Sequence, residues 1–290
     1  MEITFRSALG LGVKATDDGG SELFDVFYEG YDQAFTLPDE KEERAGFVRC
    51  MALNGGAEFE RISARLGAFR ELVVVVSLGG EVVGGANLLV TPLREHHVVT
   101  VNLNYAYVLP GHRGRGLLRR LVAACAELAA WLFPGVGPVV TVLELNDPLL
   151  LTARQYAQDS AAAGVDQFDR VVIWARIGVR VLDFPYVQPP LSDAQRSDAT
   201  LMLGVLADPG FELSGGLLAD HLERFFAISV LKNGDLDSNR PAADQVRECR
   251  ARPAIALLDP LPVLDSLRRE VGSTGPGLRE RLGDSARHPA

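Results

Sequence analysis

The chain has 290 residues and 47% of them are hydrophobic, which is enough to bury one large core or two smaller ones and excludes an intrinsically disordered protein. With 29 basic and 38 acidic residues, the formal net charge of -9 disfavours binding to nucleic acid or to an anionic membrane. No apolar stretch reaches the roughly 20 residues of a spanning helix. The amino terminus lacks a secretory pattern, so we expect a cytoplasmic protein.

Cysteine and histidine spacing argues against metal sites and disulfides. Cys50, Cys125 and Cys249 are widely separated and form neither a disulfide framework nor a CxxC pair. The histidines form no HExxH motif and no Cys/His cluster, so we expect no metal. A GxSxG elbow is also absent, which argues against a covalent hydrolase.

The first half of the chain predicts a strand, helices and then a three-stranded meander. Residues 2–6 alternate like a strand, residues 21–35 have the spacing of an amphipathic helix, and a second helix is expected from Pro38. The β-branched run 72–76 begins a hairpin with its turn at Leu78–Gly80. Val98–Val108 is the third strand.

The next segments predict a helix, a strand and a long connection. Residues 117–132 show the clearest helical spacing, and 139–145 reads as a buried strand. Residues 146–168 form a polar, alanine-rich interlude that we interpret as a lid over an acceptor site. The pattern predicts an α/β fold with a mixed sheet.

After the interlude we expect further short elements and a loose end. Gly178 stands where a helix C-cap is expected, and strands are predicted at 179–184 and 199–206. Residues 214–231 return to helical spacing. Residues 272–290, rich in Gly, Pro and Arg, are predicted to be a flexible tail.

A glycine- and arginine-rich turn separates the third meander strand from the clearest helix. Glycines let backbone N–H groups approach a ligand, and a helix N-terminus carries unsatisfied donors and partial positive charge. The turn therefore suits a phosphate or pyrophosphate, with Arg113 and Arg115 adding charge. Neither GxxxxGK[ST] nor a strand-linked GxGxxG is present. The alternative is a solvated turn before a surface helix.

The segment Val108-x-Pro110-x-x-Arg113-Gly114-x-Gly116, between a meander and an amphipathic helix, resembles the acetyl-coenzyme A loop of the GCN5-related N-acetyltransferase (GNAT) family. The likeness in element order extends from residue 1 to about 207. It implies the GNAT fold, acetyl-CoA as co-substrate, and a strand end near Tyr107 and Val108 that hydrogen-bonds the thioester and pantetheine. The backbone amides implied to hold the pyrophosphate are those of Arg113, Gly114, Arg115, Gly116, Leu117 and Leu118. Leu118 stands where the family usually has Gly or Ala.

The resemblance does not identify the acid that protonates the leaving thiolate. Ile173–Val179 matches the shape of a family pattern, but Trp174 stands in place of the usual Tyr, and an indole cannot act as an acid near neutral pH. Tyr186, stiffened by Pro185, is our candidate for this role. Tyr156 is a candidate to close over the substrate. For Trp174 and Tyr186 the alternative is ordinary packing.

Glu144 is the candidate general base, because it interrupts the apolar strand 139–145, and burial would raise the pKa of its carboxyl. The alternative is a strand-end Glu that pairs with an Arg or faces solvent. Asn146 follows at the same strand end and is a candidate to hydrogen-bond pantetheine. Asp147 is expected to cap a turn.

The resemblance implies an acetyl-CoA-dependent N-acyltransferase that transfers acetyl directly to a primary amine of a small molecule or peptide. The predicted parts are an acetyltransferase domain at 1–207, a helical C-terminal extension at 208–271 and the tail. The alternatives are a non-catalytic acyl-CoA sensor or structural protein, and a scaffold that binds no coenzyme. Phe225 and Phe226 are apolar positions that pack either on their own domain or on a second subunit, as in a homodimer.

Overall fold

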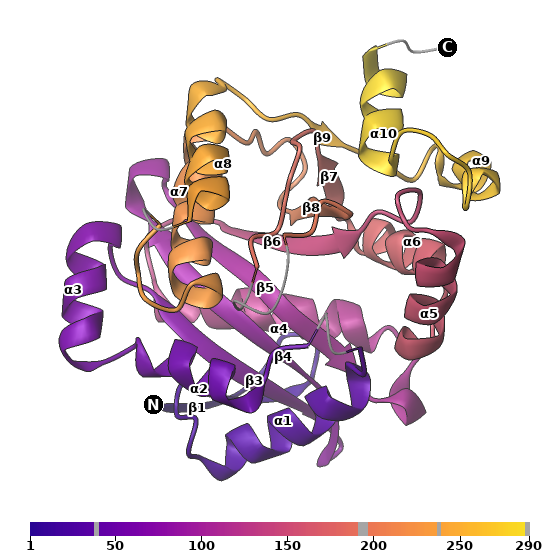
Figure 1. Ribbon diagram of the computed structural model, residues 1–290. Helices are drawn as coiled ribbons and strands as arrows, with labels where there is room; N and C mark the ends of the chain where they lie inside the picture. The colour runs from indigo at the N-terminus through magenta and orange to yellow at the C-terminus, as the bar shows by residue number, and fades with distance from the viewer. Residues whose placement is uncertain (38–40, 191–196, 237–238, 288–290) are drawn as a thin grey trace. The chain divides into compact units, whose positions relative to one another are not determined.

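The computed structural model describes residues 1–37, 41–190, 197–236 and 239–287 (Figure 1). It divides into two compact units. The first comprises Met1–Thr141 and Asp220–Ser238, and the second comprises Val142–Ala219 and Asn239–Ala290. Within the described ranges, none of the helices combines the length and the hydropathy that crossing a membrane requires.

The sheet of the first unit is antiparallel and runs in chain order. Its strands are β1 (Glu2–Arg6), β2 (Gly12–Thr16), β3 (Arg70–Leu78), β4 (Glu81–Leu93) and β5 (Val98–Val108). The predicted meander of β3, β4 and β5 is confirmed, with its first turn at the expected glycines. Strand β2 was not predicted. The register of β4 against β5 shifts between Asn87 and Leu88, so Asn104 of β5 has no partner across the ladder and forms a bulge.

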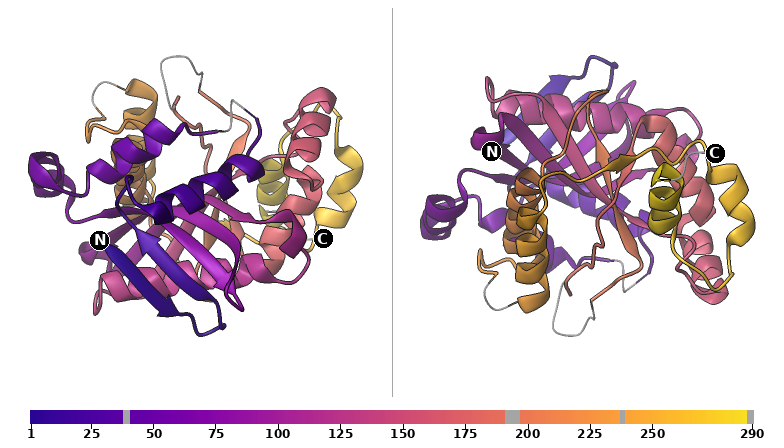
Figure 2. Two further views of the ribbon diagram at one scale, coloured as in Figure 1. Left: turned by 90° about the horizontal axis from the view of Figure 1, so that it is seen from below. Right: turned by 90° about the horizontal axis from the view of Figure 1, so that it is seen from above.

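Helices cover both faces of this sheet, and α1 and α4 can be traced on it in Figure 2. The helices of this unit are α1 (Glu22–Ala34), α2 (Arg44–Ala52), α3 (Gly56–Leu66) and α4 (Leu117–Leu132). Ser21 caps α1 by accepting the Phe24 N–H, and the aromatic face of α1 packs on Val73, Val75 and Tyr107. The second helix begins at Arg44 and not at Pro38, which lies outside the described residues.

The C-terminal part of the chain returns to the first unit. Helix α7 (Gly215–Phe225) is followed by a π-helical turn at Phe226–Val230, so the predicted helix 214–231 exists with a widened last turn. Phe225 and Phe226 are buried, with ring centroids 5.5 Å apart. Their apolar surface is therefore covered by the chain itself.

The second unit combines a small sheet with short helices. Strand β6 (Val139–Asn146) begins in the first unit and ends here, where the order is β6, β8 (Leu201–Leu206), β7 (Arg180–Leu182) and β9 (Leu257–Leu258). The helices are α5 (Ala153–Ala163), α6 (Gln167–Ile177), α8 (Arg240–Ala251), α9 (Leu264–Leu267) and α10 (Leu278–Arg287). Gly178 closes α6 in the left-handed conformation, as predicted.

The predicted tail contains a helix instead. The carboxylate of Asp147 accepts the N–H of Leu278 at 2.9 Å and so satisfies the first turn of α10. The same carboxylate accepts the Leu149 N–H at 3.0 Å, which is the turn cap that the sequence predicted. A cap supplied from 131 residues earlier in the chain leaves no signal in the local sequence of α10.

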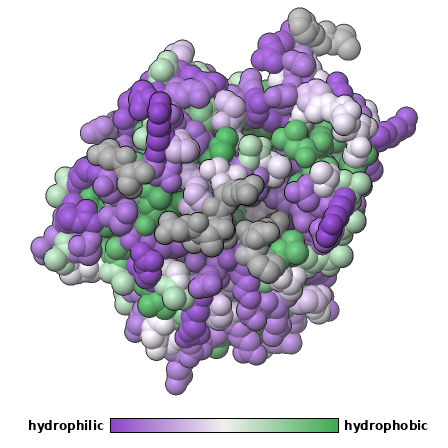
Figure 3. Space-filling view, in the orientation of Figure 1, coloured by the Kyte–Doolittle hydropathy of each residue, from purple (hydrophilic) through white to green (hydrophobic). Residues whose placement is uncertain are grey.

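On the face drawn in Figure 3, hydrophobic residues stand in small groups among hydrophilic ones. The large hydrophobic side chains exposed among the described residues are scattered along the chain, at Met1, Leu9, Val26, Val48, Trp131, Leu150, Ile173 and Leu261. Scattered exposure of this kind is ordinary.

Candidate functional site

The phosphate-loop candidate joins β5 to α4 through a short 3-10 turn at Pro110–His112. Gly114 and Gly116 follow with φ of 76° and 69°, in the left-handed region. A Cβ added at either glycine would meet no atom within 4 Å, so the need for glycine is conformational and not steric. The loop thus reaches the first turn of α4 on backbone that is open to solvent.

This loop is positively charged and its helix has no side-chain cap. Gly116 is the N-cap of α4, and no side chain accepts from the first turn. Arg113 and Arg115 are exposed, and Arg113 Nε donates to the Val108 carbonyl at 3.2 Å. The sequence has no acidic residue between Pro110 and Ala126. Backbone donors, a helix N-terminus and arginines together suit a pyrophosphate.

The other residues proposed around the loop differ in how accessible they are. Leu117 is buried and Leu118 is half-buried. Tyr107 is 4% exposed, its hydroxyl donates to the Phe27 carbonyl at 2.8 Å, and burial raises its pKa. The Tyr107 side chain therefore belongs to the aromatic core, and only its backbone can take part in binding.

The structure brings together the two residues that the sequence proposed for acid and base chemistry. In the second unit, the Tyr186 hydroxyl donates to Glu144 Oε1, and Gln188 Nε2 donates to Glu144 Oε2 at 3.0 Å. Burial raises the pKa of Glu144 to about 7, although both hydrogen bonds oppose the shift. Burial and the nearby Glu144 charge raise the pKa of Tyr186 well above its usual value. Glu144 is thus suited to gain and lose a proton near neutral pH.

Asn146 and the interlude after it form a separate polar group. Asn146 Nδ2 donates to Asp159 Oδ2 at 3.4 Å and to Gln167 Oε1 at 3.3 Å. The interlude contains α5, and the Tyr156 hydroxyl donates to both carboxylate oxygens of Asp166, the N-cap of α6, at 2.8 Å. This contact gives Tyr156 a structural role at the start of α6.

Trp174 lies in α6 and is 7% exposed. Its indole is therefore packed in the core.

Sequence reasoning missed a second buried carboxylate, Glu71, in the first unit. Glu71 is 1% exposed on β3 and accepts hydrogen bonds from Asn87, Asn104 and Ser229. Burial raises its pKa to about 7. In the sequence, Glu71 directly precedes the apolar run 72–76, and a charged residue is ordinary at such a strand end. The signal that could have found it is Asn87, an amide inside an apolar strand, because a buried amide needs a polar partner.

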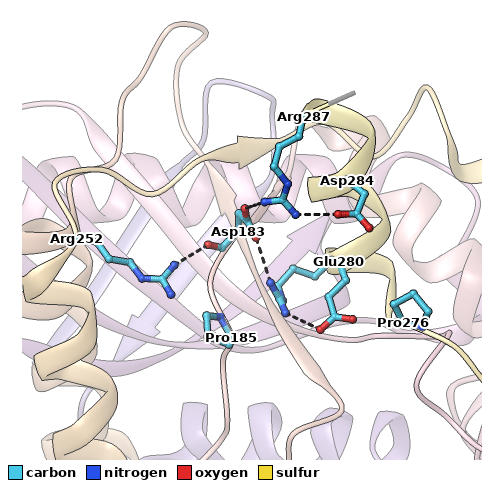
Figure 4. Close-up of a pocket in the computed structure, with 8 residues that line it drawn as sticks. Asp183, Pro185, Arg252, Pro276, Glu280, Asp284 and Arg287 are labelled. Carbon is cyan, nitrogen blue, oxygen red and sulfur yellow. Dashed lines mark hydrogen bonds and ion pairs between the residues drawn. The ribbon is translucent and has the colours of Figure 1, made fainter. Parts of the chain in front are cut away.

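A cavity of about 520 Å³ lies in the second unit (Figure 4). Its lining includes the arginines 252, 279 and 287, all of which pair with carboxylates. Arg279 lies 3.1 Å from Asp183, Arg287 lies 2.9 Å from Asp284, and Arg252 lies 2.6 Å from Glu248. Because its cations are already balanced, the cavity offers no excess positive charge to an anion.

Residues 52–148 match the model of the acetyltransferase (GNAT) family. No curated protein matches the chain. Solved structures that are similar to this chain include the following three. A putative GNAT acetyltransferase from Bacteroides thetaiotaomicron is 14% identical, with 72% of this chain and 93% of that chain covered and a TM-score of 0.47.

A putative GNAT acetyltransferase from Desulfovibrio desulfuricans is 16% identical, with 68% and 99% covered and a TM-score of 0.40. A putative acetyltransferase from Salmonella typhimurium, solved with its cofactor acetyl-CoA, is 17% identical, with 70% and 96% covered and a TM-score of 0.36. The match to the family model covers the meander, the glycine- and arginine-rich loop, α4 and β6. The fold class predicted from the sequence, a mixed α/β GNAT fold with helices in its C-terminal region, is confirmed.

Proposed function

We propose that this protein is a cytoplasmic acetyl-CoA-dependent N-acyltransferase that transfers an acetyl group directly to a primary amine of a small molecule or peptide. The observation that carries the proposal is the loop between β5 and α4. Two left-handed glycines there open the uncapped first turn of α4 beside Arg113 and Arg115. In this proposal the amides of residues 113–118 bind the coenzyme A pyrophosphate.

In the same proposal, backbone groups of Tyr107 and Val108 bind the thioester and pantetheine. Asn146 adds a hydrogen bond to pantetheine. The division into a domain at 1–207, an extension at 208–271 and a tail at 272–290 also remains a proposal, as does assembly into a homodimer.

Glu144 and Tyr186 supply the proton transfers of the proposed reaction. Glu144 accepts a proton from the substrate ammonium, and the freed amine attacks the thioester carbonyl carbon. A carbon–nitrogen bond forms, the carbon–sulfur bond breaks, and Tyr186 gives its proton to the departing thiolate. The protonated Glu144 then restores the Tyr186 hydroxyl across the contact between them. The second nitrogen proton passes to water, so amide, coenzyme A and one proton are the products.

Reversing one charge in the loop tests the proposed binding. Arg113→Glu places a carboxylate against the phosphates and should weaken acetyl-CoA binding at least tenfold, or about 1.4 kcal/mol, in a calorimetric titration. Arg240→Glu makes the same charge change on the exposed first turn of α8 and should leave the affinity unchanged. Equal affinity of Arg113→Glu and wild type would place acetyl-CoA elsewhere.

The second candidate function is a protein that binds acyl-CoA without catalysis. The buried Trp174 favours it, because an indole stands where the family usually has its acidic Tyr. Tight acetyl-CoA binding with no thiol release for any primary amine tested would select this candidate. Thiol release with one amine would exclude it.

A further inference from the structure

Two irregularities of the backbone in the first unit meet at the buried carboxylate of Glu71. One is the β-bulge at Asn104 of β5, and the other is the π-helical turn Phe226–Val230, which carries Ser229. Bulges and π-helical turns are both concentrated next to functional sites, where they redirect a side chain. Here both side chains reach the same carboxylate.

The Glu71 carboxylate accepts three hydrogen bonds from described residues. Asn87 Nδ2 donates to Oε1 at 2.8 Å and Asn104 Nδ2 donates to the same oxygen at 2.9 Å. The Ser229 hydroxyl donates to Oε2 at 2.8 Å. An ionised carboxylate satisfies all three donors, and bonds to a charged acceptor are about twice as strong as neutral ones. Protonation would reverse the Ser229 bond and weaken the two amide bonds.

The network continues from Asn104 through Asn102 to His221 of helix α7. Asn102 Nδ2 donates to Asn104 Oδ1 at 2.6 Å, and Asn102 Oδ1 lies 3.0 Å from His221 Nε2. Burial lowers the pKa of His221 to about 3, so this imidazole is neutral and donates to Asn102. The bulged residue is therefore held from both sides, by Glu71 and by the Asn102–His221 pair.

The charged and titratable groups around Glu71 come from three other segments. Lys232, which follows the π-helical turn, lowers the pKa of Glu71 and pairs with Glu42 at 2.6 Å. Cys50 of α2 donates to the Ser229 carbonyl at 3.6 Å, and burial keeps its thiol neutral by raising its pKa. Glu71 is thus the group in this network that can change charge near neutral pH.

We infer that Glu71 is a positioning residue for acetyl transfer. Its ionised carboxylate fixes the Asn104 side chain at the β5 bulge, and Ser229 of the π-helical turn holds the carboxylate by donating to its other oxygen. The inference rests on the proposed function. Strand β5 runs from this bulge directly into the phosphate loop, so the network fixes the strand that leads to the proposed cofactor site. Glu71 acts through Asn104 and does not touch the substrate.

The pH profile of turnover at saturating acetyl-CoA and amine tests this inference. If turnover requires both Glu71 and Glu144 to be ionised, a plot of log kcat against pH has a limiting slope of two on its acid side. In Glu71→Gln the slope should fall to one, and kcat at high pH should fall on the order of 10-fold to 100-fold, because small misplacements in a site have effects of this size. Glu71→Asp keeps a titrating carboxylate and should keep the slope of two.

Two further variants separate positioning from general stability. If Glu71 acts through Asn104, adding Glu71→Gln to Asn104→Ala should lower kcat no further. If the two residues acted independently, the factors by which each substitution lowers kcat would multiply. Thr91→Val removes a different buried contact between β4 and β5, the 2.6 Å Thr91–Thr100 hydrogen bond. This control should lower the melting temperature and leave the slope at two.

The possible outcomes distinguish this inference from the proposed function. A wild type that turns over with a slope of one, or a Glu71→Gln variant that keeps a slope of two, overturns the role of Glu71 alone. A wild type that binds acetyl-CoA but releases no thiol with any amine overturns both. A slope of two that falls to one only in the Glu71→Gln and Glu144→Gln variants supports both.

Discussion

Glu71 and Glu144 are two buried carboxylates, one in each compact unit, and burial raises the pKa of each to about 7. Their partners differ. Two amides and a hydroxyl donate to Glu71, whereas the donors to Glu144 are an amide and the phenol of Tyr186. A phenol can pass on its proton, but an amide cannot. In our proposals, the same pKa therefore serves proton transfer at Glu144 and the fixing of a neighbouring side chain at Glu71.

Glu144→Gln should lower turnover more than any of the other substitutions. Loss of a general base lowers turnover by about 100-fold to 10,000-fold. Wild-type turnover should also rise with pH through about 7, since only the ionised carboxylate accepts a proton. Stopped or continuous thiol-release assays measure both effects.

Acetyl-CoA affinity is the control for Glu144→Gln, because the proposed base does not hold the coenzyme. Tyr186→Phe keeps the ring and removes the proposed acid, so it should slow turnover without removing the ionisation of Glu144. Wild-type turnover in the Glu144→Gln variant would mean that the carboxylate is only structural.

Glu71→Gln should change how the stability of the fold depends on pH. The unfolded chain loses this proton near pH 4.5, whereas the folded chain holds it to about pH 7. Between these values the folded state binds more protons, so this group's stabilising contribution is full below pH 4.5 and is lost as pH rises to 7. The free energy of unfolding of Glu71→Gln, minus that of wild type, should therefore rise by about 3 kcal/mol from pH 4 to pH 8.

Urea unfolding at both pH values measures this difference. Thr91→Val, which keeps Glu71, should show no such trend. A difference that is independent of pH would mean that Glu71 has an ordinary pKa.

A feature could be predicted from the sequence when the residues that cause it lie close together in the chain. The strand, glycine turn and helix around the loop lie within one short segment, and the sequence predicted their order correctly. Glu144 was visible because it interrupts an apolar strand. Glu71 was missed, because the sequence marks it only indirectly through Asn87, and another of its donors, Ser229, is 158 residues away. Helix α10 was missed for the same reason, since Asp147 caps it from far along the chain.

A pair of glycine variants separates backbone strain from ligand binding. Gly116 and Gly135 both have φ near +70° and open space around an added Cβ. Gly116→Ala and Gly135→Ala should each lower stability by about 1 to 2 kcal/mol, because a Cβ is disfavoured in the left-handed region. Only Gly116→Ala should also weaken acetyl-CoA binding in a calorimetric titration. Equal affinities for the two variants would remove the loop backbone from the proposed site.

The smallest expected effect concerns the cap of α10. Asp147→Ala removes the acceptor of the Leu278 N–H and should destabilise the protein by about 1 kcal/mol. Amide hydrogen exchange should accelerate in the first turn of α10. Asp265→Ala removes an exposed carboxylate in α9 and serves as the control. Unchanged exchange in α10 would mean that the cap contributes little to its stability.

We propose that the loop between β5 and α4 binds acetyl-CoA, and a calorimetric titration of the whole protein with acetyl-CoA, alongside free coenzyme A, tests this binding. We expect saturable binding of both ligands, and a ligand excess of about 100 times the Kd should stabilise the fold by about 2.7 kcal/mol. A melting-temperature shift provides the independent check. Absence of heat and of any melting shift at millimolar acetyl-CoA would mean that the loop does not bind acetyl-CoA.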